Sequence, residues 1–279
     1  MGSLEINLPQ IGFGTADLGS ETQAAVIEAL SCGYRLIDTA RAYDSEQAVG
    51  NAVAKLCNEG MIKREDIIVQ TKLSPAVSGY YQTLDDFQRS LESLQMDYID
   101  VYFIHWPVIR GNEQNYRDKN IETWQAFEKL HQEKKVRALG VCNFLERHLI
   151  DILDHCSIAP AIHQLELHPG YQQKGLVRFS KEHGMCIEAW SPMGRGILDQ
   201  PQFLEMAENY HKNIGQLALR WSCEQGYIPL TRSSNKEHMK SNRDIFDFEM
   251  KDEDLQILDA LNTNNGYMDI WSYKRQQMY

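Results

Sequence analysis

The sequence predicts an α/β fold, a single (β/α)8 TIM barrel with its active site at the C-terminal rim of the strands. Three observations support this prediction. Short apolar runs alternate with helix-length amphipathic stretches along the chain, and eight such runs can be counted. The length of 279 residues fits one barrel of roughly 250 residues. No Pro-, Gly- or Ser-rich linker interrupts the alternation, so we expect one domain over residues 1–279.

The expected strands are short runs rich in β-branched, aliphatic and aromatic residues. They cover residues 11–15, 35–40, 67–72, 99–105, 136–143, 161–167, 186–191 and 228–233. The amphipathic stretches predict helices over residues 45–60, 83–96, 122–135, 147–155, 174–184, 214–226, 237–244 and 252–262. Because a barrel of this type places its chemistry at the carboxyl ends of the strands, functional residues are expected there.

Composition restricts the partners and the compartment. The formal net charge of -11 would repel nucleic-acid phosphates and anionic lipids, so a small molecule is the expected partner. The six cysteines are scattered singly, without the spacing of zinc sites or disulfide frameworks. The first residues lack the features of a signal peptide, and no run reaches ~18 apolar residues. We therefore expect a cytoplasmic protein without a membrane span.

Polar residues gather at the expected carboxyl ends of the strands. They are Asp38, Lys72, His105, Asn143 and Gln164, with Tyr43 in the loop just beyond Asp38. Any one of them, taken alone, is equally well explained as a solvated loop residue or a structural ion pair. Ionisable groups are costly in an apolar interior unless they are paired, so their convergence on one rim indicates a functional site.

The glycines near the N-terminus allow a second interpretation, a dinucleotide-binding Rossmann unit. Gly12 and Gly14 lie in an apolar run, and the acidic residue Asp38 follows about 20 residues later. The third glycine of that fingerprint is missing, because position 17 is Asp17. The barrel is therefore the better interpretation.

Six segments carry a resemblance to a known family. GYRLIDTARAYDSEQAVG, TKLSP, SLESLQMDYIDVYFIHWP, VRALGVCNF, HQLELHP and IEAWSPMGRG resemble, in this order, the signature segments of the aldo-keto reductases. The resemblance runs from Leu8 to about Asn242. It implies an oxidoreductase that reduces an aldehyde or ketone to an alcohol, with NADPH as cofactor and NADH as the alternative. It also implies a catalytic tetrad of Asp38, Tyr43, Lys72 and His105.

The chemistry of carbonyl reduction agrees with that tetrad. The reaction needs a hydride at carbon and a proton at oxygen, and the nicotinamide supplies only the hydride. Tyr43 is the expected proton donor, and a Lys72 cation nearby would lower the phenol pKa. Asp38 would keep that ammonium charged and in place. His105 would hydrogen-bond the substrate oxygen and stabilise the developing charge.

The resemblance also assigns a cofactor site that includes Asp38. The end of the first strand contributes Gly14, Thr15 and Ala16. The carboxamide is expected at Cys142, Asn143 and Gln164, and the nicotinamide ring against Trp190. The pyrophosphate is expected at Ser191, Pro192, Met193, Gly194 and Gly196. The adenosine end is expected at Arg232, Ser233, Ser234, His238 and Asn242.

Four positions depart from the family pattern. Cys142 replaces the usual serine and is a weaker hydrogen-bond donor, and Trp190 replaces a more frequent tyrosine. Arg232 stands where the family has lysine, and His238 stands where it has arginine. Because an imidazole is mostly neutral at pH 7, the preference for NADPH over NADH is expected to narrow.

Substrate choice is expected in loops over residues 107–121, 194–202 and 267–279. His105 and Trp106 are the expected substrate contacts, although Trp106 would also fit as a plug of the barrel mouth. No metal is expected, because His163 and His168 would face opposite sides of their strand. We expect a monomer or weak dimer. The alternative function is a cofactor-binding regulatory or structural protein on the same fold, as the family's channel subunits and lens crystallins illustrate.

Overall fold

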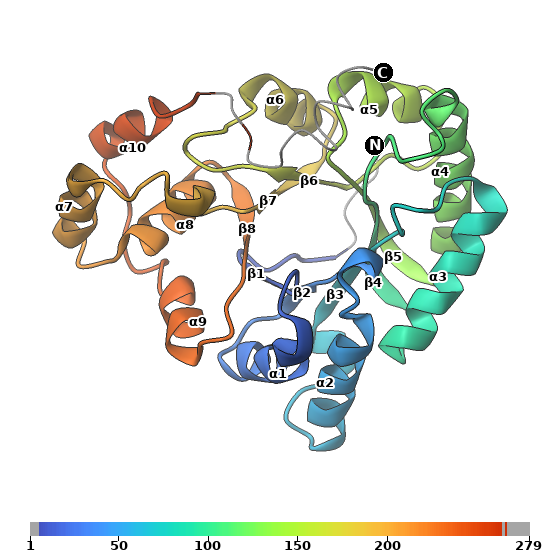
Figure 1. Cartoon of the computed structure of the whole chain (residues 1–279), viewed down its shortest axis with the longest axis horizontal. Coiled ribbons are helices and arrows are strands. Elements are labelled where there is room, and N and C mark those ends of the chain that lie inside the picture. The colour runs from blue at the N-terminus through green and yellow to red at the C-terminus, as the bar shows by residue number, and fades with distance from the viewer. Residues whose placement is uncertain (1–5, 264–265, 267–279) are drawn as a thin grey trace.

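The computed structural model describes residues 6–263 and residue 266. All eight strands are parallel and pair in sequence order, and β8 pairs with β1 to close a barrel (Figure 1). The strands are Gly12–Gly14 (β1), Leu36–Asp38 (β2), Ile68–Lys72 (β3), Ile99–Ile104 (β4), Val136–Cys142 (β5), Ile162–Glu166 (β6), Cys186–Trp190 (β7) and Tyr227–Thr231 (β8). The predicted (β/α)8 fold is confirmed, and each expected strand is present but one to three residues shorter, with β8 beginning one residue before its expected start.

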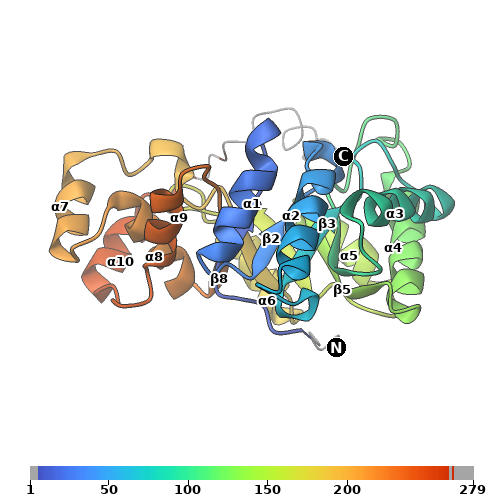
Figure 2. The same cartoon turned by 90° about the horizontal axis from the view of Figure 1, so that it is seen from below.

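The helices surround the strands in both views (Figures 1 and 2). They are Thr22–Ser31 (α1), Glu46–Asn58 (α2), Tyr80–Leu94 (α3), Tyr116–Gln132 (α4), Glu146–Leu153 (α5), Lys174–Glu182 (α6), Pro201–Asn209 (α7), Ile214–Glu224 (α8), Lys236–Arg243 (α9) and Asp252–Asp259 (α10). Within the described residues, no helix has both the length and the apolar character that a bilayer crossing requires.

The residue pattern did not predict two of these helices. The helix α1 buries Ala25, Val26, Ala29 and Leu30, which lie on one face at helical spacing. The helix α7 begins with a proline at its first turn, a position where the missing N–H costs no hydrogen bond. The expected loop over residues 194–202 therefore ends in a helix. The helix α4 also begins six residues before the expected position 122, because its polar first turn carries no apolar signal.

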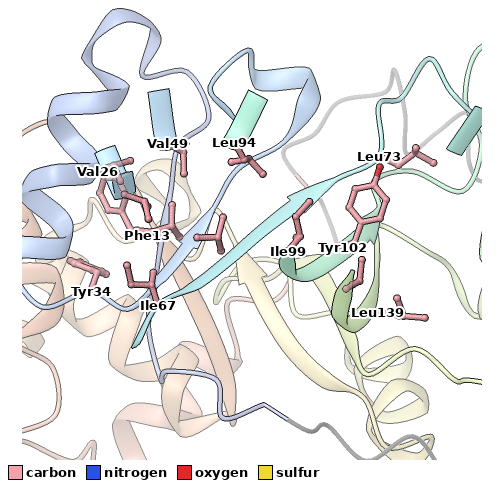
Figure 3. Close-up of a cluster of buried hydrophobic side chains, with 14 of the residues drawn as sticks. Phe13, Val26, Tyr34, Val49, Ile67, Leu73, Leu94, Ile99, Tyr102 and Leu139 are labelled. Atoms are coloured by element: carbon pink, nitrogen blue, oxygen red, sulfur yellow. The ribbon is translucent and has the colours of Figure 1, made fainter. Parts of the chain in front are cut away.

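The strands bury two different faces. Outward-facing side chains pack against the helices in two apolar clusters, and part of the larger one is drawn in Figure 3. Phe13 from β1 lies edge-on to Tyr34, with ring centroids 5.6 Å apart. Tyr102 from β4 stacks on Phe127 of α4 at 4.6 Å. The two clusters hold the helical ring onto the barrel, because burial of apolar area is the main favourable term in folding.

A further apolar cluster fills the inside of the barrel, and we call six of its strand residues the apolar interior: Leu36, Ile68, Val101, Phe103, Ala138 and Ile162. The Phe103 ring takes the space beside Gly140, where an added Cβ would lie 2.4 Å from the ring. Gly12 is required for a similar reason, since a Cβ there would lie 2.5 Å from the Leu230 side chain. The barrel is thus a packed core and not a pore.

Candidate active site

The four residues of the expected tetrad come from three neighbouring strand ends. Asp38 and Lys72 are the last residues of β2 and β3, and His105 directly follows β4. Tyr43 ends a short 3-10 turn, Arg41–Tyr43, that follows β2. The Lys72 ammonium is completely buried and donates hydrogen bonds to Asp38 Oδ1 at 2.6 Å and to the Thr39 carbonyl at 3.1 Å.

Tyr43 lies above this ion pair. The Lys72 Nζ atom is 5.0 Å from the centre of the Tyr43 ring. The His105 ring stands edge-on to the Tyr43 ring, with centroids 5.7 Å apart and an interplanar angle of 84°. The fold therefore brings the four side chains together, with a phenol and an imidazole side by side over a buried cation.

Further polar groups lie inside the barrel beneath Tyr43. We refer to five residues together as the polar interior: Asp38, Gln70, Lys72, Gln164 and Glu188. Gln70 Nε2 donates to Asp38 Oδ1 at 2.9 Å and to Glu188 Oε2 at 2.8 Å. Gln164 Nε2 donates to the same two oxygens at 3.0 and 2.8 Å. Glu188 was missed from the sequence, although alternation along β7 places it between inward-facing Cys186 and Trp190.

Burial and charge act together on the tetrad. Burial alone would lower the pKa of Lys72, but Asp38, Tyr43 and Cys142 together outweigh burial and raise that pKa. Burial raises the pKa of Tyr43 to about 12. Lys72 lowers the Tyr43 pKa, as expected, but does not offset the burial. Burial, with the positive charge of Lys72, holds the pKa of His105 well below 6.5. His105 is therefore a neutral hydrogen-bonding group.

Two further buried groups near the ion pair are shifted toward their neutral forms. Burial, followed by the negative charge of Asp38, raises the pKa of Glu188 to about 7. Burial also raises the pKa of Cys142, and the Lys72 cation only partly offsets this effect. The Cys142 thiol stays protonated and donates to Gln164 Oε1 at 3.6 Å.

The groups expected around a nicotinamide lie together at the rim. The Trp190 indole N–H donates to Asn143 Oδ1 at 2.9 Å, and Asn143 Nδ2 donates to the His105 carbonyl at 3.2 Å. Asn143 adopts a left-handed backbone with φ 62°, which aims its amide at these partners. The flat Trp190 ring is suited to contact with an aromatic ring, and the neighbouring amides are suited to hydrogen bonds with a carboxamide. Both hydrogens of the Gln164 amide are used within the barrel, so this residue can offer only Oε1.

The loop after β7 turns sharply. Ser191, Gly194, Arg195 and Gly196 all have positive φ angles, from 47° to 96°. At Gly194 an added Cβ would lie 2.6 Å from Ile197 and 2.9 Å from the His168 ring, so the loop packs tightly on itself. A compact glycine-containing turn at a barrel rim is a suitable support for a pyrophosphate.

At the expected adenosine end, Arg232 already has partners. Its Nη1 atom donates to the Ala16 carbonyl at 2.8 Å and to Asp17 Oδ2 at 2.9 Å. Asp17 was not predicted to take part. His238 is exposed in the first turn of α9, where its backbone N–H is capped by the Asn235 side chain. Asn242 follows one turn later on α9 and is buried, so both face one side of the helix.

The other expected contacts have simpler surroundings. The buried Thr15 hydroxyl donates to the Asp38 carbonyl at 3.0 Å, so this residue ties the first strand end to the second. Trp106 is half-buried with its ring 6.2 Å from the His105 ring, which fits a pocket wall or a plug equally. Pro192 is buried, Met193 and Ser233 are half-buried, and Ser234 is exposed. The expected substrate segment over residues 267–279 lies outside the described residues.

The two histidines considered as metal ligands are separated. His163 contacts the Ser180 hydroxyl at 2.8 Å, on the helix side of β6. His168 lies beyond the strand, 3.4 Å from Glu166. Over residues 6–263, no group of three or more His, Cys, Asp or Glu side chains could hold a metal ion.

Comparisons with known proteins agree with this geometry. The model of the aldo/keto reductase family matches residues 10–263. A 9,11-endoperoxide prostaglandin H2 reductase of Trypanosoma cruzi is 40% identical over 92% of this chain and 89% of its own length. A glyoxal reductase of Bacillus subtilis is 38% identical over 92% and 90%. Among solved structures, a Bombyx mori aldo-keto reductase in complex with NADP has a TM-score of 0.88 and 31% identity, covering 96% and 93% of the two chains. The aldose reductase of Schistosoma japonicum has a TM-score of 0.89 and 29% identity, covering 96% and 93%.

Proposed function

The chain belongs to the aldo/keto reductase family of NAD(P)H-dependent enzymes, and from this premise we propose that it reduces an aldehyde or ketone to an alcohol with NADPH. The observation that carries the proposal is the buried Asp38–Lys72 pair beneath the Tyr43 phenol, with neutral His105 beside it. A buried ion pair is a costly feature for a barrel that needs only to fold. Its position next to a phenol supports a chemical role.

Each of the four side chains has a task in this proposal. The His105 ring orients the carbonyl oxygen by a hydrogen bond, because its low pKa keeps it neutral. Tyr43 gives its proton to that oxygen as negative charge develops there. Lys72 stabilises the phenolate that is left, and Asp38 holds the ammonium in place through the 2.6 Å hydrogen bond. Reduced nicotinamide, when bound, supplies the hydride.

The cofactor residues are proposed from the same geometry. Trp190 would contact the nicotinamide ring, and Asn143, Cys142 and the Gln164 Oε1 atom would face its carboxamide. The loop from Ser191 to Gly196 would contact the pyrophosphate. Arg232, Ser233, Ser234, His238 and Asn242 would surround the adenosine end, with Gly14 to Ala16 beside it. A 2′-phosphate would have to share Arg232 with Asp17, which supports a modest preference for NADPH over NADH.

The test is NADPH oxidation with a panel of small aldehydes and ketones, beginning with glyoxal and nitrobenzaldehyde. Glyoxal is included because a relative carries the name glyoxal reductase. Turnover that produces the corresponding alcohol supports the proposal. Tight NADPH binding without turnover of any carbonyl would contradict it.

We also propose that residues 1–279 form one domain that acts as a cytoplasmic monomer or weak dimer. All six cysteines are free, which fits a reducing compartment. Light scattering over a concentration series tests the oligomeric state, and a single cooperative unfolding transition is expected for one domain.

A further inference from the structure

Glu188 is a buried carboxyl group that the proposed reaction does not yet use. It lies inside the barrel on β7 and is completely inaccessible to solvent. Its Oε2 atom accepts hydrogen bonds from Gln70 Nε2 and Gln164 Nε2, both at 2.8 Å. The same two nitrogens donate to Asp38 Oδ1 at 2.9 and 3.0 Å. Two side-chain amides therefore connect two carboxyl groups.

This arrangement fixes the direction of both amides. An amide nitrogen has two hydrogens, and here each nitrogen uses one for Asp38 and one for Glu188. Rotating the Gln164 amide by half a turn would direct its oxygen at two carboxyl oxygens, which is unfavourable. Glu188 therefore holds the Gln164 amide oxygen toward Cys142 and the rim, where a carboxamide N–H can reach it.

We propose that Glu188 is a positioning residue of the reductase site, which fixes the Gln164 amide and, by gaining or losing a proton, changes the charge beneath the Tyr43 phenol. The inference rests on the proposed function of Tyr43 as proton donor. Glu188 touches neither substrate nor nicotinamide in this account. It acts through Gln164 and through the Asp38–Lys72 pair.

The groups around Glu188 make it the one in this cluster that changes charge near neutral pH. It faces Asp38 on β2, Lys72 on β3, Cys142 on β5 and Cys186 on its own strand. Burial and the Asp38 charge raise the pKa of Glu188 to about 7, against the smaller opposite effects of the two amides and Lys72. Burial raises the pKa of both thiols, so they remain neutral. Among the described residues, Glu188 Oε1 has no hydrogen-bond partner and is the oxygen free to carry the proton.

The charge of Glu188 determines whether the rate of carbonyl reduction rises or falls with pH. Below about pH 7 Glu188 is neutral, whereas above it an added negative charge raises the pKa of Tyr43 and makes it a weaker acid. The rate of carbonyl reduction should therefore fall by about three- to tenfold between about pH 6 and about pH 8. His105 cannot cause this change, since its pKa lies well below that range.

The experiment compares wild type with Glu188→Gln and with the exposed control Glu182→Gln, whose residue lies on α6. The rate constant kcat is measured at saturating NADPH across this pH range. Wild type and Glu182→Gln should show the fall near pH 7, and Glu188→Gln should be flat. Infrared difference spectra should show a protonated carboxyl group that titrates near pH 7 and is absent from Glu188→Gln.

Three results would overturn the proposal or its premise. The same pH profile in Glu188→Gln and wild type would overturn the role of Glu188 while leaving the reductase function intact. Infrared spectra that show Glu188 ionised at every pH tested would also overturn the role of Glu188. This measurement follows the carboxyl band of the wild-type protein, so it does not depend on the folding of a variant. Lack of any carbonyl turnover in wild type would instead overturn the proposed function.

Discussion

The apolar interior and the polar interior occupy the same barrel and differ by two residues along the same strands. On β2 Leu36 precedes Asp38, and on β6 Ile162 precedes Gln164. The alternation of side chains along a strand and the close packing of the interior require only an inward-facing side chain of suitable size at each of these positions. The apolar interior meets that requirement at little cost. The polar interior buries charges that need several hydrogen bonds to be tolerated.

This difference identifies the part of the barrel where chemistry is expected. The apolar interior is explained by folding alone, since Phe103 and Gly140 interlock like any packed core. The polar interior is not, because hydrocarbon side chains could fill the same space without desolvating ions. Residues that lower stability and meet at one rim are candidates for function.

Tyr43→Phe should cause the largest loss. Phenylalanine keeps the ring between Lys72 and His105 but removes the proton donor, so kcat should fall by about 10² to 10⁴-fold. The dissociation constant for NADPH, measured by fluorescence quenching, should stay close to the wild-type value, because the phenol acts on substrate. Tyr81→Phe on the exposed surface is the matched control. Retention of more than about a tenth of kcat would remove Tyr43 from this role.

Lys72→Met should lower both stability and activity. The substitution leaves Asp38 as an unpaired buried carboxylate, which should lower the free energy of unfolding by about 3–5 kcal/mol. Urea denaturation measures this loss. The same change at Lys55, whose partner Glu59 is exposed, should cost no more than about 1 kcal/mol. The remaining activity should shift to higher pH, because Lys72 lowers the pKa of Tyr43. Equal losses from both variants would contradict the account.

Glu188→Gln should change how stability depends on pH. The ordinary pKa of this carboxyl group is 4.5, and burial raises it to about 7 in the folded protein. Its contribution to stability is therefore full below about pH 4.5 and is lost as pH rises to about 7, a loss of about 3 kcal/mol. Glu188→Gln should not lose stability as the pH rises, so at about pH 8 it should be more stable than the wild-type protein. A stability difference from wild type that is constant over pH would contradict the assignment.

His238→Arg should have the smallest effect, because it lies outside the barrel on exposed α9. A guanidinium offers the 2′-phosphate a permanent positive charge and bidentate hydrogen bonds that an imidazole cannot match, so NADPH should bind severalfold more tightly. The NADH dissociation constant should hardly move. His183→Arg, on the exposed end of α6, is the control. Unchanged NADPH binding would show that this side chain does not reach the phosphate.

The sequence was sufficient to predict the parts that depend on local patterns. Eight apolar runs predicted the closed barrel, and short motifs predicted which strand ends meet. The helix α1 was missed although Val26 and Leu30 carry a helical spacing, because small alanines weaken the apolar signal. The helix α7 was also missed, because it begins inside the expected loop over residues 194–202, although a first-turn proline is favourable for a helix.

Contacts between distant residues could not be predicted in the same way. Gln70 and Glu188 are 118 residues apart and meet only because the barrel closes. Arg232 and Asp17 are 215 residues apart and pair where β8 returns to β1. The rise in the Tyr43 pKa was also missed, since burial outweighs the Lys72 charge only in the packed structure. The alternation of inward- and outward-facing side chains along β7 would have placed Glu188 inside the barrel, but it would not have identified the hydrogen-bond partners of Glu188.

The most direct test of the difference between the apolar interior and the polar interior compares one variant from each. Both the free energy of unfolding and kcat are measured for each variant. The double variant Asp38→Asn/Lys72→Met removes the ion pair without leaving either charge alone, so stability should equal or exceed that of wild type. Its kcat should fall by at least about 10²-fold. Ile162→Val should lose about 0.5–1.5 kcal/mol of stability and keep its kcat. A double variant that loses several kcal/mol of stability, or that retains wild-type kcat, would contradict the claim that the polar interior exists for chemistry.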